Sequence, residues 1–311
     1  MSATPLPPAV RSGNTPPGVI PPRVTLFATA HEPTVEIPAI GQGTWYMGEG
    51  LAPRRDEVSA LQRGLDLGMA LIDTAEMYAD GGAEEVVGEA LVGRRDKAFL
   101  VSKVYPWNAG CDSAIAACEA SLKRLRTDHL DLYLLHWPGD IPVEETLEAF
   151  DRLREAGKIR RFGVSNFDVD EMAALHALPG GESCAVNQVL YHLGSRGIEH
   201  SLLPWQREHA IPTMAYCPLA QAGQLRRALL THPELLEIAS SLGITPTQLL
   251  LAWAIRPVDG RRDVIAIPKA TGLEHVEQNA GALTLQLTDE ALHRLDTAFP
   301  APRRKEPLDI V

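Results

Sequence analysis

The chain has 311 residues, of which 45% are hydrophobic and 22% charged, so a chain that is disordered throughout is excluded. It carries 29 basic and 40 acidic side chains, a net charge of −11, which excludes the overall basic surface that nucleic-acid and membrane-surface binders need. We therefore expect no nucleic-acid or membrane partner, and we expect any anionic ligand to be bound by local donors.

The cysteines and the N-terminal segment indicate the compartment. Four cysteines are scattered without a C-x-x-C pair or a short Cys/His cluster, which predicts neither a disulfide framework nor a metal site. Residues 1–22 contain seven prolines and no apolar run typical of a signal peptide. We predict a disordered, proline-rich tail over 1–22 and a single domain over 23–311. The expected protein is soluble and cytoplasmic, a monomer or a small homo-oligomer.

In chain order, residues 24–28 and 34–37 alternate apolar and polar side chains and predict a short hairpin. Apolar runs then alternate with amphipathic stretches. The runs end on a polar or aromatic residue, in turn Thr44, Asp73, Lys103, His136, Ser165, Gln188, Tyr216 and Lys269. Successive residues of this series lie 23 to 33 positions apart, except Tyr216 and Lys269, which lie 53 apart. A βα unit takes about 30 residues, so the spacing predicts one unit after another.

Between these runs, apolar residues recur near the helical period of 3.6. The stretches are 57–67, 84–91, 114–125, 143–156, 233–242, 246–253 and 289–299. Eight strands alternating with helices predict an α/β fold, a closed (β/α)8 TIM barrel with an N-terminal β-hairpin and extra C-terminal helices. An open, doubly wound sheet is the alternative.

The polar strand ends predict a site. In a parallel barrel the carboxyl ends of the strands open on one rim, where catalytic residues gather. Asp73, Lys103 and His136 end the second, third and fourth strands, and Tyr78 follows in the loop after Asp73, so we expect all four around one cavity. Taken singly, each has a structural interpretation: Asp73 as a helix cap, Lys103 as a surface lysine and His136 as a core histidine.

Together the four residues form a proton-donor set. A phenol with a pKa near 10 is too weak an acid at neutral pH, so the Lys103 ammonium is expected to lower the pKa of Tyr78. Asp73 would hold that ammonium charged and in place. A neutral His136 would donate a second hydrogen bond to a carbonyl oxygen. This chemistry needs neither a nucleophile nor a metal.

The segments around these residues resemble the aldo-keto reductase superfamily over about residues 24–300. They are residues 40–45, 71–78, 101–103, 134–138, 163–167, 187–188, 215–219 and 267–269. Residues 76–89, 105–110 and 191–197 resemble the bacterial methylglyoxal reductase type in particular. The resemblance implies NADPH-dependent reduction of aldehydes and ketones to alcohols. Tyr78 would be the general acid, Asp73 and Lys103 the pair that adjusts its pKa, and His136 the donor that orients the carbonyl.

The resemblance also implies an NADPH site. Ser165, Asn166 and Gln188 would bind the nicotinamide carboxamide, and Tyr216 would stack on the ring. The other implied cofactor-binding residues are Gly43, Thr44, Trp45 and Asp73, then Cys217, Pro218, Leu219 and Gln221 along the pyrophosphate, Ile267, Pro268, Lys269, Ala270 and His275 near the ribose phosphate, and Gln278 and Asn279 at the adenine. The substrate would lie among Trp45, Tyr78, Trp107, His136 and Trp137.

The sequence departs from the family pattern in two places. Ala270 and His275 stand where many members have serine and arginine, which predicts NADPH with weaker discrimination against NADH. Only residues 300–311 follow the last predicted helix, and this short tail predicts an open substrate mouth that accepts small aldehydes.

Two other functions remain open. A lyase would use Lys103 to form a Schiff base with its substrate, but it leaves Tyr216 and Lys269 without a role. A regulatory subunit would bind NADPH with little turnover, and it would not need the complete proton-donor set.

Overall fold

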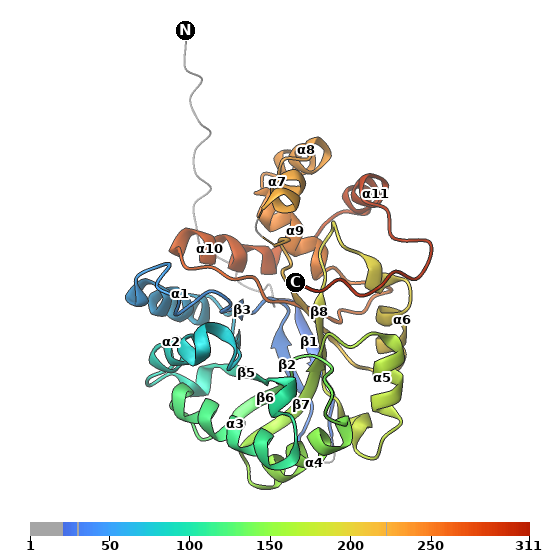
Figure 1. The fold of residues 1–311 in the computed structure, drawn as a ribbon. Coiled ribbons are helices and arrows are strands. Elements are labelled where there is room, and N and C mark those ends of the chain that lie inside the picture. Colours follow the sequence, from blue (N-terminus) through green and yellow to red (C-terminus); the bar gives the residue numbers. More distant parts are fainter. Residues whose placement is uncertain (1–20, 30, 222) are drawn as a thin grey trace.

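The eight parallel strands follow one another in chain order around a barrel (Figure 1). The computed structural model describes residues 21–29, 31–221 and 223–311. The strands are β3 (Gln42–Gly43), β4 (Leu71–Asp73), β5 (Phe99–Val104), β6 (Leu130–Leu135), β7 (Ile159–Ser165), β8 (Asn187–Leu190), β9 (Thr213–Tyr216) and β10 (Val264–Ala266).

The first and last strands of the sheet meet and close it. Ile40 pairs with Ala266 and Gly43 with Lys269, both in parallel, and the Gly41 amide donates to the Ala266 carbonyl at 2.8 Å. This confirms the predicted (β/α)8 barrel and excludes the open sheet, whose edge strands would remain unpaired.

Helices cover the outside of the barrel (Figure 1). In chain order they are α1 (Arg54–Asp66), α2 (Gly82–Ala90), α3 (Cys111–Leu125), α4 (Val143–Glu155), α5 (Val169–His176), α6 (Leu202–Glu208), α7 (Gln224–Leu230), α8 (Pro233–Ser241), α9 (Pro246–Ala254), α10 (Leu273–Gly281) and α11 (Asp289–Ala298). Short 3-10 turns lie at Tyr78–Gly81, Arg95–Lys97, Pro106–Asn108, Gly181–Ser183, Gly197–Glu199 and Ala282–Thr284.

The predicted helices correspond to α1–α4, α8, α9 and α11. The predicted stretches do not include α5, α6, α7 and α10, which are seven to nine residues long. A local signal does exist for α5: Asp168 and Glu171 form a capping box at its start. In the described residues no single helix is long and apolar enough to cross a membrane, although α8 and α9 together reach that length and composition while meeting at 91°.

The predicted hairpin is present as β1 (Arg23–Leu26) and β2 (Val35–Pro38). Its inner side chains, Val24, Leu26 and Ile37, join the hydrophobic core. The loop between the strands contacts the start of β7, where Arg161 donates to the Pro33 carbonyl. The hairpin therefore lies at the end of the barrel where the strands begin, opposite the rim that carries the polar residues. The predicted tail concerns mainly residues 1–20, which lie outside the described residues, and the tail and single-domain boundaries stay predictions.

The strand ends differ slightly from the prediction. β8 spans Asn187–Leu190 instead of ending at Gln188, because its pairing with β9 continues as far as Leu190. His136 lies one residue beyond β6, and Lys269 lies three residues beyond β10. Gln188 consequently points into the barrel from within a strand.

Candidate active site

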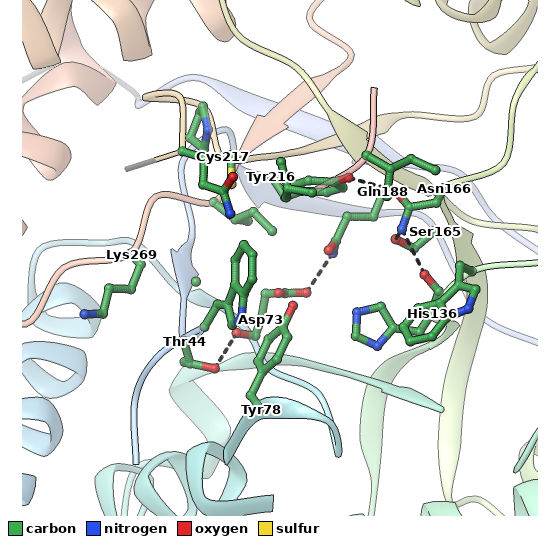
Figure 2. Close-up of a pocket in the computed structure, with 18 of the residues that line it drawn as sticks. Thr44, Asp73, Tyr78, His136, Ser165, Asn166, Gln188, Tyr216, Cys217 and Lys269 are labelled. Carbon is green, nitrogen blue, oxygen red and sulfur yellow. Dashed lines mark hydrogen bonds between the residues drawn. The ribbon is translucent and has the colours of Figure 1, made fainter. Parts of the chain in front are cut away.

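A cavity of about 840 Å³ opens at the carboxyl end of the strands (Figure 2). Most of the predicted residues line it: Gly43, Thr44, Trp45, Asp73, Tyr78, His136, Trp137, Ser165, Asn166, Gln188, Tyr216, Cys217, Pro218, Leu219, Gln221, Ile267, Pro268 and Lys269. The barrel thus brings together side chains that are separated by more than two hundred residues in the sequence.

Some predicted residues are not on this wall. Lys103 lies behind it with no exposed surface. Trp107 is 62% exposed and stacks on Tyr105 at 4.1 Å between ring centres. The described cavity wall also leaves out Ala270, His275, Gln278 and Asn279, which follow β10 toward and along α10. Their predicted contacts with a cofactor stay predictions.

Lys103 is the centre of the proton-donor set. Its Nζ, carried by β5, donates to Asp73 Oδ2 at 2.8 Å, to the Thr74 carbonyl at 2.8 Å and to Tyr78 Oη at 3.2 Å. An ammonium has three N–H donors, so all three are used. Burying a charge is costly unless it is paired and hydrogen-bonded, and this arrangement meets both conditions. The alternative interpretation of Lys103 as a surface lysine is therefore wrong.

A strained turn aims the Tyr78 side chain at Lys103. Ala79, Asp80 and Gly81 follow with φ of 53°, 50° and 89°, three left-handed residues in succession. Such conformations cost about 1–2 kcal/mol for each non-glycine residue, so the surroundings must hold them. Gly81 is backed by the side chain of Arg124.

The support behind this turn is an ion pair. Arg124 on α3 donates to the buried carboxylate of Glu84 on α2, which also accepts from Ser102 Oγ on β5 at 2.6 Å. The turn is thereby fixed between two helices and the strand that carries Lys103.

The pKa of Tyr78 differs from the prediction. Burial, and then the nearby Asp73 carboxylate, raise this pKa well above its usual value, whereas the sequence predicted that Lys103 would lower it. The loss of water around Tyr78 destabilises the charged phenolate more than the Lys103 ammonium stabilises it. Burial likewise lowers the pKa of Lys103, against the opposing effect of Asp73. Tyr78 therefore keeps its proton in the resting site, and the Lys103 N–H is placed to stabilise Oη when that proton leaves.

His136 is neutral, as expected. It is 8% exposed, and burial together with the Lys103 charge lowers its pKa to about 2. Its ring meets the Tyr78 ring edge-on, with 5.8 Å between centres. In the described part of the chain, Nδ1 is buried and has no hydrogen-bond partner. A buried polar atom without a partner is unfavourable, so this side of the ring adds nothing to the stability of the fold.

The opposite wall carries amides beneath an aromatic ring (Figure 2). Tyr216 Oη donates to Asn166 Oδ1 at 2.8 Å, and Asn166 Nδ2 donates to the His136 carbonyl at 3.1 Å and to Ser165 Oγ at 3.2 Å. Gln188 Nε2 reaches across and donates to Asp73 Oδ1 at 2.7 Å. Amide and hydroxyl groups beside the ring of Tyr216 suit a flat heterocycle that bears a carboxamide, so these residues fit a nicotinamide.

Cations line the far end of the same cavity. Lys269 is exposed on this wall, and the partial desolvation of its ammonium lowers its pKa. Arg226 of α7 lies on the wall as well, which the sequence did not predict. Within the described residues neither side chain is engaged in an ion pair, so both are available to an anionic group such as a phosphate.

Residues 39–299 match the family model described as "Aldo/keto reductase family". The chain belongs to the aldo/keto reductase family. This aldo-keto reductase is 59% identical over 277 residues to "Methylglyoxal reductase YeaE" of Escherichia coli (strain K12), covering 89% of this chain and 96% of that protein. It is 33% identical over 266 residues to "Glyoxal reductase" of Bacillus subtilis (strain 168), covering 84% of this chain and 89% of that one.

Solved structures agree with this assignment. A crystal structure of an aldo/keto reductase from Klebsiella pneumoniae, in complex with NADP and acetate, matches with a TM-score of 0.86 and 59% identity. The match covers 89% of this chain and 96% of that chain.

Nine residues on the cavity wall of this aldo-keto reductase were not predicted from the sequence. They are Tyr46, Met77, Pro138, Glu171, Ala220, Arg226, Leu308, Ile310 and Val311. Tyr46 stacks on Trp45 with 4.6 Å between ring centres. Because it directly follows Trp45 in the sequence, its place on the wall could have been predicted. The last three come from the C-terminal tail, which returns over the barrel mouth (Figure 1). The sequence did not predict that the short tail forms part of the wall, and the expectation of a mouth that accepts small aldehydes stays a prediction.

Three polar contacts, made by two of its residues, hold that tail in place. Lys305 forms ion pairs with Asp168 at 3.3 Å and with Asp170 at 3.1 Å, and Asp309 accepts a hydrogen bond from Ser195. Leu308 between them packs against the core.

Proposed function

We propose that this aldo-keto reductase reduces small aldehydes and ketones to alcohols with NADPH, and that reactive dicarbonyls such as methylglyoxal are among its substrates. The observation that carries the proposal is the Lys103 ammonium held between Asp73 and Tyr78 on the floor of a cavity that fits a nicotinamide. The methylglyoxal reductase relative and the NADP-bound structure support the same cofactor and substrate class.

The chain's own residues deliver the proton and place the carbonyl. NADPH, when bound, supplies a hydride to the carbonyl carbon. Tyr78 Oη gives its proton to the carbonyl oxygen, and the Lys103 N–H stabilises the phenolate as it forms. Neutral His136 donates a hydrogen bond to the same oxygen and orients it. The aromatic wall of Trp45, Tyr46 and Trp137 limits the space around the carbonyl.

The geometry does not favour a lyase. A Schiff base requires a neutral amine with room for the substrate carbon. The Lys103 amine has all three donors engaged and no exposed surface.

We further propose a cytoplasmic location, a monomeric or small homo-oligomeric state, and no nucleic-acid or membrane partner. The net charge of −11 supports the absence of nucleic-acid and membrane partners, because it repels polyanions and acidic lipids. All four cysteines are free, which suits a reducing compartment.

The test is NADPH oxidation by the purified protein with methylglyoxal, glyoxal, aromatic aldehydes and sugars, compared with Tyr78→Phe. We expect turnover of the small aldehydes by the native protein. Without the phenolic proton, Tyr78→Phe should lose about 10²–10⁴-fold in kcat. The variant should still bind NADPH, because the residues expected to hold the cofactor are unchanged. We call them the cofactor half of the cavity: Ser165, Asn166, Gln188, Tyr216 and Lys269. Undiminished turnover by the variant would remove Tyr78 as the general acid, and no turnover of any carbonyl by the native protein would contradict the function.

A further inference from the structure

The Asp73 carboxylate is held at both oxygens. Oδ2 accepts from Lys103 at 2.8 Å. Oδ1 accepts from Gln188 Nε2 at 2.7 Å (Figure 2). All three residues are at most 2% exposed. Gln188 lies on β8 and Asp73 on β4, strands that are not neighbours in the sheet, so this hydrogen bond spans the interior of the barrel.

Chemistry fixes which way the Gln188 amide faces. An ionised carboxylate only accepts hydrogen bonds, and Asp73 is opposite the Lys103 ammonium, so Gln188 must present its NH₂ group to it. Within the described part of the chain, the Gln188 Oε1 atom accepts no hydrogen bond, and the side chain lines the cavity. One amide thus faces both the proton-donor set and the cofactor half of the cavity.

We propose that Gln188 is a positioning residue for the proton donors, in addition to any contact with a nicotinamide. A carboxylate with one partner can rotate about its Cβ–Cγ bond, whereas one held at both oxygens cannot. Gln188 therefore fixes the plane of Asp73, and through it the position of Lys103 against Tyr78. This inference rests on the proposed function, in which these three residues deliver a proton.

The same amide also links the two halves of the cavity. A hydrogen bond accepted by Gln188 Oε1 from a bound carboxamide would polarise the amide and strengthen the N–H bond to Asp73. Occupation of the cofactor half would then tighten the proton-donor half.

Lys103 offers a direct readout of this hydrogen bond without the cofactor. The titratable groups around its Nζ are Asp73 on β4, Tyr78 in the following turn, His136 after β6 and Glu84 on α2. Only the first of these contacts Gln188. When the amide donor is removed, the carboxylate charge is directed wholly toward the ammonium, so the pKa of Lys103 should rise.

The variant is Gln188→Met, which keeps the volume and removes the donor. The matched control is Ser165→Ala, a change on the same wall at a residue that does not contact Asp73. The pH titration of the Lys103 side-chain signal is followed by NMR in cofactor-free protein labelled with ¹³Cε-lysine, with Lys103→Met to assign the signal. We expect its midpoint to move to higher pH in Gln188→Met and to stay in place in Ser165→Ala.

Kinetics give a second readout. At saturating NADPH, Gln188→Met should lose about 10–100-fold in kcat with a larger solvent deuterium isotope effect, because proton delivery is misplaced. Ser165→Ala should change mainly the Michaelis constant for NADPH.

An unchanged Lys103 midpoint in Gln188→Met overturns the inference and leaves Gln188 as a cofactor contact only. If Gln188→Met does not fold, Gln188→Asn takes its place, since its amide is one methylene too short to reach Asp73. A native protein without turnover would contradict the proposed function, but the NMR comparison would still decide the role of Gln188.

Discussion

Lys103 shows why single residues could be interpreted in two ways from the sequence. A lysine in an apolar strand has no local signal that tells whether it faces solvent or a site. The structure buries it completely and gives it three acceptors, one of which is the Tyr78 hydroxyl. A buried charge stabilises a fold poorly, so this arrangement is better explained by chemistry than by stability.

His136 should make the protein sensitive to acid. Its pKa is about 2 in the folded protein and near 6.5 in the unfolded chain, so below pH 6.5 only the unfolded chain takes up the proton. The contribution of His136 to the free energy of unfolding is therefore fully present above pH 6.5. It is lost as the pH falls, with a slope approaching about 1.4 kcal/mol per pH unit. Urea unfolding between pH 7 and 4.5 should show a shallower pH dependence for His136→Gln than for the native protein. Exposed His31 supplies the control, and a His31→Gln variant with the same change in slope would contradict the assignment.

Lys269 should discriminate between the two nicotinamide cofactors. It is one of two cations, with Arg226, at the far end of the cavity, and a charged hydrogen bond to a phosphate is worth about 1.5–3 kcal/mol. Lys269→Ala should therefore raise the Michaelis constant for NADPH about 10–100-fold and change that for NADH far less. Lys97→Ala, at an exposed residue of the turn Arg95–Lys97 that is not on the described cavity wall, is the control. Equal effects on both cofactors would show that Lys269 does not meet the extra phosphate.

At the scale of elements, the strands and helices are regular and the irregular backbone is concentrated at the site. Left-handed residues other than glycine occur on or beside the cavity wall at Tyr46, Ala79, Asp80, Asn166, Cys217 and Ala220. Local strain of this kind persists only where packing enforces it, and it gathers where geometry matters for function. Here it sets the directions of Tyr78 and of the amide of Asn166.

The turn after Tyr78 is testable through Gly81. A Cβ there would come within 2.5 Å of Arg124 Cδ, and the backbone has a φ of 89°. Gly68 has a similar φ of 91° with no atom within 4 Å of its Cβ position. Both changes to alanine should cost about 1–2 kcal/mol from the backbone, and Gly81→Ala should cost more because it also displaces Arg124.

The measurements are the free energy of unfolding and kcat for Gly81→Ala and Gly68→Ala. We expect kcat to fall about tenfold only in Gly81→Ala, because only that turn positions Tyr78. If the two variants lost the same stability and kept the same kcat, the turn would not be what positions the phenol.

At the scale of the whole molecule, closure of the barrel and the return of the tail create the cavity. The sheet brings β3 beside β10, and the tail then covers part of the mouth with Leu308, Ile310 and Val311. The site is therefore assembled from nearly the full length of the chain, from Gly43 onward.

The tail should contribute to substrate binding. Leu308→Ala removes an apolar side chain from the wall and leaves the cofactor residues in place, so the Michaelis constant for aldehydes should rise about 3–30-fold with little change in NADPH affinity. Steady-state kinetics with a series of aldehydes of increasing length measure this. Exposed Leu236 on α8 is the control, as Leu236→Ala. Unchanged constants for every aldehyde would show that the tail is not part of the substrate wall.

The sequence by itself determined the alternation of strands and helices, the hairpin and the polar residue at each strand end. These features are local, because the period of apolar residues records which face each element buries. The strand-end pattern also grouped Asp73, Tyr78, Lys103 and His136 as one set, and the resemblance then implied a role for each.

Only the tertiary structure decided that Gln188 reaches Asp73, that the tail covers part of the mouth, and that burial raises the pKa of Tyr78. The first two are contacts between residues more than a hundred positions apart, and they exist only once the barrel has closed. The third depends on how much water the surrounding side chains exclude, which no local pattern records.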